Sequence, residues 1–173
     1  HEEVGSVSAI GADGPFLEII IDRLSGGGSA SLVSRIINKS LMMSCDNAHA
    51  THPNFSNKHD GGHLPKLNGG PVVKVNVKQR YATTSLTSSI FRQLCDELEI
   101  PVQTFVSRND LGCGSTIGPI AAARLGVPTL DVGIPQLAMH SCREITGADD
   151  PLRLSRVLIE FFNKAEAITV GLE

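Results

Sequence analysis

The sequence contains few aromatic residues, and this scarcity limits how its core can be built. Aromatic side chains make up 4% of the 173 residues, and tryptophan is absent. The hydrophobic fraction of 41% is still enough for a core, which must rest on Val, Ile, Leu and Ala. The length fits one domain or a large part of one.

Clusters of basic residues and long apolar runs are also missing. The formal net charge is −3, and Lys and Arg form no block and do not alternate with aromatics, so nucleic acid is not an expected partner. No apolar run approaches the roughly 20 residues that a membrane-spanning helix needs. No signal-peptide pattern is visible. We therefore expect neither a nucleic acid nor a membrane as a partner.

The cysteines do not form a recognisable metal-binding or disulfide pattern. There are four, and none belongs to a CxxC pair: Cys45, Cys95, Cys113 and Cys142. This spacing is typical of neither a zinc finger nor a disulfide-rich domain. A reducing, cytoplasmic setting is the simplest interpretation, with each cysteine serving as a small apolar residue.

Hydrophobic periodicity predicts helices that alternate with strands. Helices are expected over 16–24, 32–37, 84–98, 117–125 and around 154–162, and strands over 41–44, 72–77, 102–106 and 129–132. Residues 48–70 are rich in His, Asn, Gly and Pro, which predicts a long loop. The alternation favours an α/β layered fold with a largely parallel sheet, in which ligands bind at the carboxyl ends of the strands.

Three separated segments carry residue types that bind divalent metals. They contain the adjacent pair Glu2 and Glu3, then Asp46, then His140, and the last two follow expected strands. Zinc accepts carboxylate and imidazole ligands. Separations of roughly 40 and 90 residues match no local metal motif, so surface or purely structural roles stay open. In extended backbone the two glutamates would point to opposite faces, so a shared site requires the chain to bend there.

Other histidines and a glycine-rich segment are weaker candidates. His49 lies close behind Asp46, whereas His59 and His63 have two glycines between them, which disfavours a helical two-histidine zinc site. The sequence GCGST at 112–116 precedes an expected helix but lacks the lysine of a phosphate-binding loop. A tight turn that lets backbone approach the site closely is the favoured interpretation.

Five motifs in a fixed order resemble one family. They are HEEVGS at 1–6, DNAHATHPN at 46–54, GPVVKVN at 70–76 with QRYAT at 79–83, CGSTIGPI at 113–120, and QLAMHS at 136–141 with RE at 143–144. Together they resemble the aspartyl aminopeptidase family of dinuclear zinc aminopeptidases, in a bacterial-type version. The similarity runs nearly end to end and is weakest around 26–31. Because five motifs share the family's order, the resemblance is specific.

The resemblance implies a fold and assigns roles to residues. The implied fold is a three-layer α/β/α arrangement with a mostly parallel mixed sheet, of the zinc exopeptidase type. Residues 1–173 correspond to the C-terminal part of the catalytic domain, without the upstream part and the dimer-forming domain. Glu2 matches the general base. The family's zinc ligands correspond to Glu3, Asp46 and His140 of this sequence. Its substrate-contacting positions correspond to His49, Lys74 and Tyr81. Lys74 is the expected partner of an acidic side chain on the substrate.

The implied reaction is hydrolysis of N-terminal residues, chiefly Asp or Glu, from a peptide substrate. It uses two zinc ions about 3.5–4 Å apart. Family members form homo-oligomers, commonly dodecamers. A further histidine and a bridging aspartate of the family's zinc site lie upstream of His1, so we expect the 173-residue chain alone to lack activity. Two alternatives stay open: a preference for neutral N-terminal residues, and a non-catalytic assembly module of the same fold.

Overall fold

A four-stranded sheet occupies the centre of the molecule. The computed structural model describes residues 1–164, except for the side chain of Glu3. Its central strands are β1 (Met42–Cys45), β3 (Val72–Val75), β4 (Gln103–Val106) and β5 (Thr129–Gly133), in the spatial order β1-β5-β3-β4. β1 pairs parallel with β5, β3 pairs parallel with β4, and β3 pairs antiparallel with β5. The sheet is therefore mixed and mostly parallel, as predicted.

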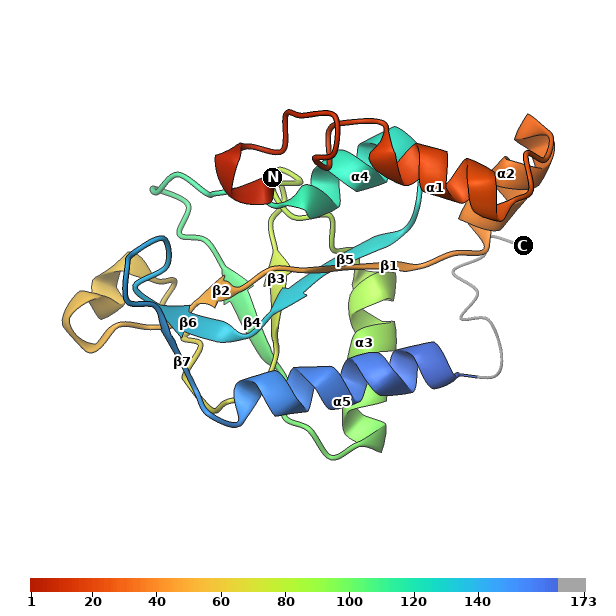
Figure 1. Ribbon diagram of the computed structural model, residues 1–173. Helices are drawn as coiled ribbons and strands as arrows, with labels where there is room; N and C mark the ends of the chain where they lie inside the picture. Colours follow the sequence, from red (N-terminus) through yellow and green to blue (C-terminus); the bar gives the residue numbers. More distant parts are fainter. Residues whose placement is uncertain (165–173) are drawn as a thin grey trace.

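Helices cover both sides of this sheet (Figure 1). On one side lie α1 (Phe16–Leu24), α2 (Ala30–Asn38) and α4 (Ile117–Leu125), and on the other lie α3 (Ser85–Glu97) and α5 (Asp150–Asn163). This confirms the predicted three-layer α/β/α arrangement. The helices at 16–24 and 117–125 have the bounds that the sequence predicts, and the other three helices lie where helices were expected.

The main core lies between the sheet and the α3–α5 layer. Helix α3 begins with a capping box, in which Thr84 and Thr87 each hydrogen-bond the other's backbone N–H. Its inner face buries Phe91 and Leu94 against strand residues such as Val132. Each fully buried side chain of this kind stabilises the fold by about 1.5–3 kcal/mol. The core is thus built mainly from aliphatic residues and one phenylalanine ring.

A second, smaller sheet includes residues at the start of the predicted loop over 48–70. It consists of β2 (Ala48–His49), β6 (Pro135–Leu137) and β7 (Ile145–Thr146), in the order β2-β6-β7. A 3₁₀ helix, η2 (Pro53–Lys58), follows β2. The prediction of a long loop over 48–70 was therefore wrong for β2 and η2. The parallel pairing of β2 with β6 brings residues 46–49 beside the segment that leads to His140.

Two further elements differ from the sequence prediction. Strand β3 ends at Val75 and not at residue 77, because Asn76 begins a turn in which its side chain accepts from the Lys78 amide at 2.9 Å. The N-terminal residues form a 3₁₀ turn, η1 (Glu2–Val4), where an extended segment would have separated the two glutamates. Within residues 1–164, no helix combines the length and apolar character that a bilayer crossing requires.

Candidate functional site

A cavity of about 160 Å³ lies near the ends of the central strands. Its walls include six of the seven residues singled out from the sequence: Glu2, Asp46, His49, Lys74, Tyr81 and His140. They come from five separate parts of the chain, and the fold brings them to one place. The seventh, Glu3, has a side chain outside the described part of the structure.

Asp46 enters the cavity from the end of β1. Its backbone N–H donates to the Val132 carbonyl at 3.0 Å, which continues the β1–β5 pairing past the last strand residue. Gly133 allows this close approach, because a Cβ added there would lie 1.8 Å from the Asp46 carbonyl oxygen. A glycine at this position therefore sets where the Asp46 carboxylate lies.

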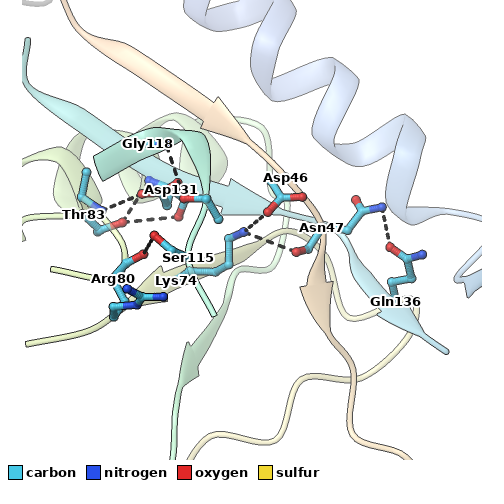
Figure 2. Close-up of polar contacts among 11 residues, drawn as sticks. Asp46, Asn47, Lys74, Arg80, Thr83, Ser115, Gly118, Asp131 and Gln136 are labelled. Atoms are coloured by element: carbon cyan, nitrogen blue, oxygen red, sulfur yellow. Dashed lines mark hydrogen bonds and ion pairs between the residues drawn. The ribbon is translucent and has the colours of Figure 1, made fainter. Parts of the chain in front are cut away.

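Lys74 is a buried cation in the middle of β3, with 2% of its surface exposed. Its ammonium donates to Oδ2 of Asp46 at 3.2 Å and to the Asn47 carbonyl at 3.3 Å, as Figure 2 shows. The same nitrogen lies 5.2 Å from the centre of the Tyr81 ring. The carboxylate, the carbonyl and the aromatic face together stabilise a charge that burial alone would disfavour.

Tyr81 forms a buried wall of the cavity. Burial is the main reason that its pKa lies well above the ordinary value of a tyrosine, and the neighbouring Cys113 side chain raises the pKa further. The negative charges of Asp131 and Asp46 act in the same direction. The edge of Phe105 packs against the ring at 6.2 Å between centroids. The phenol therefore stays neutral, with its hydroxyl hydrogen-bonded to the Cys113 side chain.

His49 lies on β2 beside the same cavity. Burial lowers its pKa, and the positive charges of His59, His140 and Lys74 lower it further, while Asp46 opposes them. The lowered pKa favours the neutral imidazole near neutral pH. A neutral ring keeps one nitrogen lone pair that can accept a hydrogen bond.

The segment that carries His140 has an unusual backbone. Ala138 and His140 have φ angles of +57° and +65°, a left-handed conformation that costs a non-glycine residue about 1–3 kcal/mol. The Ser141 amide closes a turn onto the Ala138 carbonyl at 3.0 Å, and the Glu144 carboxylate accepts from the His140 amide at 2.6 Å. Such strain persists where surrounding contacts hold it, which is common at functional sites.

The N-terminal turn brings Glu2 to the cavity wall. The Gly5 amide donates to the Glu2 carbonyl at 2.9 Å, and Gly5 ends the turn with a φ of +92°. The backbone over these residues is therefore a tight turn and not an extended strand. The backbone thus has the bend that Glu2 and Glu3 need in order to contribute to one site, as expected from the sequence.

The donor types at the cavity fit zinc. A carboxylate from Asp46 and an imidazole from His140 are ligands that zinc accepts, and the half-buried Glu2 supplies a second carboxylate. Among the side chains that the structure describes, no three His, Cys, Asp or Glu groups lie close enough together to form a complete metal site. Asp46 and His140 are therefore candidate members of a ligand set that needs further donors.

Sequence reasoning missed two contributors to this region. Asp131, in β5, is fully buried and accepts hydrogen bonds from two segments that line the cavity. Cys113 contacts Tyr81 from the GCGST segment. The sequence did contain a hint of Asp131, because a carboxylate within a predicted strand is rarely buried without hydrogen-bond or charge partners. The GCGST segment was expected to approach the site, but nothing in the sequence assigned a role to Cys113 itself.

The fold and the cavity define a class of protein. Carboxylates and histidines that meet at the strand ends of a three-layer α/β fold are typical of α/β metallohydrolases. Residues 1–162 match the family model described as Aminopeptidase I zinc metalloprotease (M18). The chain belongs to this M18 aminopeptidase family, which confirms the resemblance found in the sequence.

Relatives and solved structures agree with this assignment. The chain is 58% identical over 166 residues to "Probable M18 family aminopeptidase 2" of Stutzerimonas stutzeri and 56% identical to the protein of that name from Pseudomonas aeruginosa. Each alignment covers 96% of this chain and 38% of the relative, so the chain spans well under half of these proteins. In the cryo-EM structure of the Ape4 and Nbr1 complex, a chain 43% identical superposes with a TM-score of 0.92, over 100% of this chain and 34% of that one. A chain of the S. cerevisiae mApe1 dodecamer, 30% identical, superposes with a TM-score of 0.82, over 94% of this chain and 36% of that one.

Proposed function

We propose that the full-length protein is a zinc-dependent aminopeptidase that removes N-terminal acidic residues from peptides. The observation that carries the proposal is the single cavity that gathers the base, ligand and substrate-contact candidates from five parts of the chain. Membership in the M18 family supports the same activity. Because the chain spans only 38% of its curated relatives, the proposal concerns the whole protein.

Two zinc ions would be held by Asp46, His140 and Glu3, together with donors from outside this chain. When bound, they would polarise the scissile carbonyl and activate water. Glu2 would take the proton of the attacking water and pass it to the leaving amine, and its position in the cavity wall supports this role.

Lys74 supports a preference for Asp or Glu at the N-terminus of the substrate. An ammonium carries three N–H donors, and the two hydrogen bonds to Asp46 and Asn47 account for two of them. The neutral phenol of Tyr81 adds no negative charge that would repel an acidic side chain. A cation with one remaining N–H donor, beside a cavity of about 160 Å³, suits a short acidic side chain.

Two other functions have weaker support. A preference for neutral N-terminal residues would follow if the Asp46 carboxylate cancelled the Lys74 charge in the working enzyme. A non-catalytic assembly module is disfavoured, since it would have no need to keep these side chains around one cavity.

We also propose a cytoplasmic homo-oligomer, on the basis of the cysteine pattern and of the dodecamer formed by the relative mApe1.

Hydrolysis by the purified full-length protein tests the proposal. Aspartyl, glutamyl and leucyl aminoacyl substrates are compared with and without a chelator, followed by addition of zinc. We expect faster turnover of the two acidic substrates, loss with the chelator and recovery with zinc. Faster leucyl turnover would favour the neutral preference, and no turnover together with no bound zinc would favour the assembly module.

The 173-residue chain by itself is expected to be inactive. The family pattern implied by the sequence resemblance requires two more metal ligands, a histidine and an aspartate, besides those matched in this chain. Robust zinc-dependent hydrolysis of an acidic aminoacyl substrate by this chain alone would contradict the expectation.

A further inference from the structure

Asp131 is a buried carboxylate that lies outside the proposed reaction. It lies in the middle of β5 and is 0% exposed. Its two oxygens have different partners: Oδ2 accepts from the Ala82 amide at 2.6 Å, and Oδ1 accepts from the Thr116 hydroxyl at 2.6 Å. Burying an ionisable carboxylate is costly unless its hydrogen bonds are satisfied. The short contacts indicate that the chain uses Asp131 to join these two segments.

The two segments come from distant parts of the sequence and meet at β5. Ala82 and Thr83 follow β3, and the Thr83 hydroxyl both accepts from the Asp131 amide at 3.0 Å and donates to its carbonyl at 3.4 Å. Thr116 ends the GCGST segment and caps α4. Figure 2 shows the Asp131 side chain between Thr83 and the start of α4.

A second link joins the same two segments nearer the surface. The Arg80 guanidinium donates to the Gly114 carbonyl at 3.3 Å, and the Ser115 hydroxyl donates to the Arg80 carbonyl at 3.1 Å. These groups are exposed, so water competes with each bond and its contribution is small. The buried bonds of Asp131 are therefore the stronger constraint on how the segments lie.

Gly118 makes room for the buried carboxylate. A Cβ added at this residue, in the first turn of α4, would lie 2.2 Å from Oδ2 of Asp131. Its amide donates to the Thr116 hydroxyl oxygen at 3.3 Å, so one hydroxyl caps the helix and also donates to Asp131. The start of α4 is thus built around this carboxylate.

Both joined segments are walls of the cavity. Tyr81 lies next to Ala82, and residues 112–116 form the facing wall, whereas Asp131 itself does not line the cavity. We propose that Asp131 is a positioning residue, which fixes Tyr81 and the 112–116 wall relative to each other for substrate binding. This inference rests on the proposed aminopeptidase function. It assigns Asp131 no contact with the substrate or the metal.

Variants of the full-length protein that weaken the buried links test this proposal. Thr116→Val removes the donor to Asp131 at nearly constant volume, and Gly118→Ala displaces the carboxylate while favouring the helix. We expect each to lower kcat/KM by about tenfold or more, and Thr116→Ser to stay within about threefold of the wild type. Thr129→Val is the control, because it removes a buried hydroxyl on the same strand that donates to the Val127 carbonyl.

A readout that does not depend on activity separates this proposal from the proposed function. Fluorotyrosine is incorporated, and the ¹⁹F resonance of Tyr81 is assigned by its loss in Tyr81→Phe. We expect Thr116→Val and Gly118→Ala to shift or broaden that resonance, and Thr129→Val to leave it in place. An unchanged resonance in folded Thr116→Val and Gly118→Ala would overturn the inference. A wild type without peptidase activity would refute the proposed function, and the resonance would still decide the role of Asp131.

Discussion

The ammonium nitrogen of Lys74 lies 3.2 Å from Oδ2 of Asp46, and the lysine is 2% exposed. This pair links a proposed zinc ligand to the cation proposed to recognise the substrate. Removing one partner of a buried ion pair costs about 3–5 kcal/mol, because the other charge is left uncompensated. A change at Lys74 is therefore expected to affect the cavity more strongly than a change at a surface lysine.

Replacing Lys74 tests whether it sets the substrate preference. Lys74→Met in the full-length protein is expected to lower the ratio of kcat/KM for aspartyl over leucyl substrates by about 10- to 100-fold, since charge-assisted hydrogen bonds contribute about 1.5–3 kcal/mol. Lys78→Met changes an exposed lysine four residues away and should leave the ratio unaltered. Equal ratios in the wild type and in Lys74→Met would show that Lys74 does not recognise the acidic side chain.

The roles proposed for Glu2 and Asp46 predict two different kinds of inactive variant. Glu2→Gln is expected to reduce kcat by at least about 100-fold while the protein keeps its zinc, because it removes a base and not a required ligand. Asp46→Asn is expected to weaken zinc binding by more than about tenfold. Zinc content, measured by elemental analysis beside activity, distinguishes the Glu2 variant from the Asp46 variant. The exposed Asp96→Asn is the control and should keep both zinc and activity. Loss of zinc in Glu2→Gln would assign that glutamate to the ligand set instead.

The close approach of β5 to Asp46 predicts that residue 133 accepts only glycine. In Gly133→Ala, the new Cβ would lie 1.8 Å from the Asp46 carbonyl oxygen, so backbone must move. We expect a loss of about 2–4 kcal/mol in the free energy of unfolding, seen as a lower thermal midpoint. Gly61→Ala is the matched control, since an added Cβ there meets no atom within 4 Å. Equal midpoints for the two variants would contradict this account.

The sequence was sufficient for the layered fold because its helices and longer strands have clear periodicity. The helix at 117–125 combines alanines with a threonine cap, and the strand at 129–132 contains the β-branched residues Thr129 and Val132. The short strands β2, β6 and β7 could not be predicted, since two or three residues carry no period. They form because the chain bends after Gly133 and pairs with residues 48–49.

The candidate site was predictable in its members but not in its contacts. Asp46 and His140 are separated by more than 90 residues, so only the ordered motifs suggested that they share a site. The pairing of Lys74 with Asp46 depends on how β3 lies next to the end of β1, and that is set by tertiary packing. Asp131 was missed for the same reason, because both of its partners lie in loops that reach it only in the folded chain.

Cys95 is predicted to be the least reactive cysteine of the chain in the native state. It is 0% exposed, and burial, with the nearby charge of Asp96, raises its pKa to about 12, while Arg92 opposes this shift. At pH 8 only about one Cys95 side chain in ten thousand would be a thiolate, which is the form that alkylating reagents attack. Cys45 and Cys142 are both exposed, but partial burial raises the pKa of Cys45, so Cys142 is expected to react first.

Alkylation followed by mass spectrometry measures this difference in the full-length protein. At pH 8, iodoacetamide should modify Cys142 in the native state and Cys95 only after denaturation. The raised pKa also fixes the sign of the pH effect. The thiol's contribution to stability is complete below the ordinary pKa of 9.0 and is lost as the pH rises toward 12, because the unfolded chain then releases its proton first. Native-state labelling of Cys95 at the rate of Cys142 would mean that α3 opens far more often than its buried, capped structure implies.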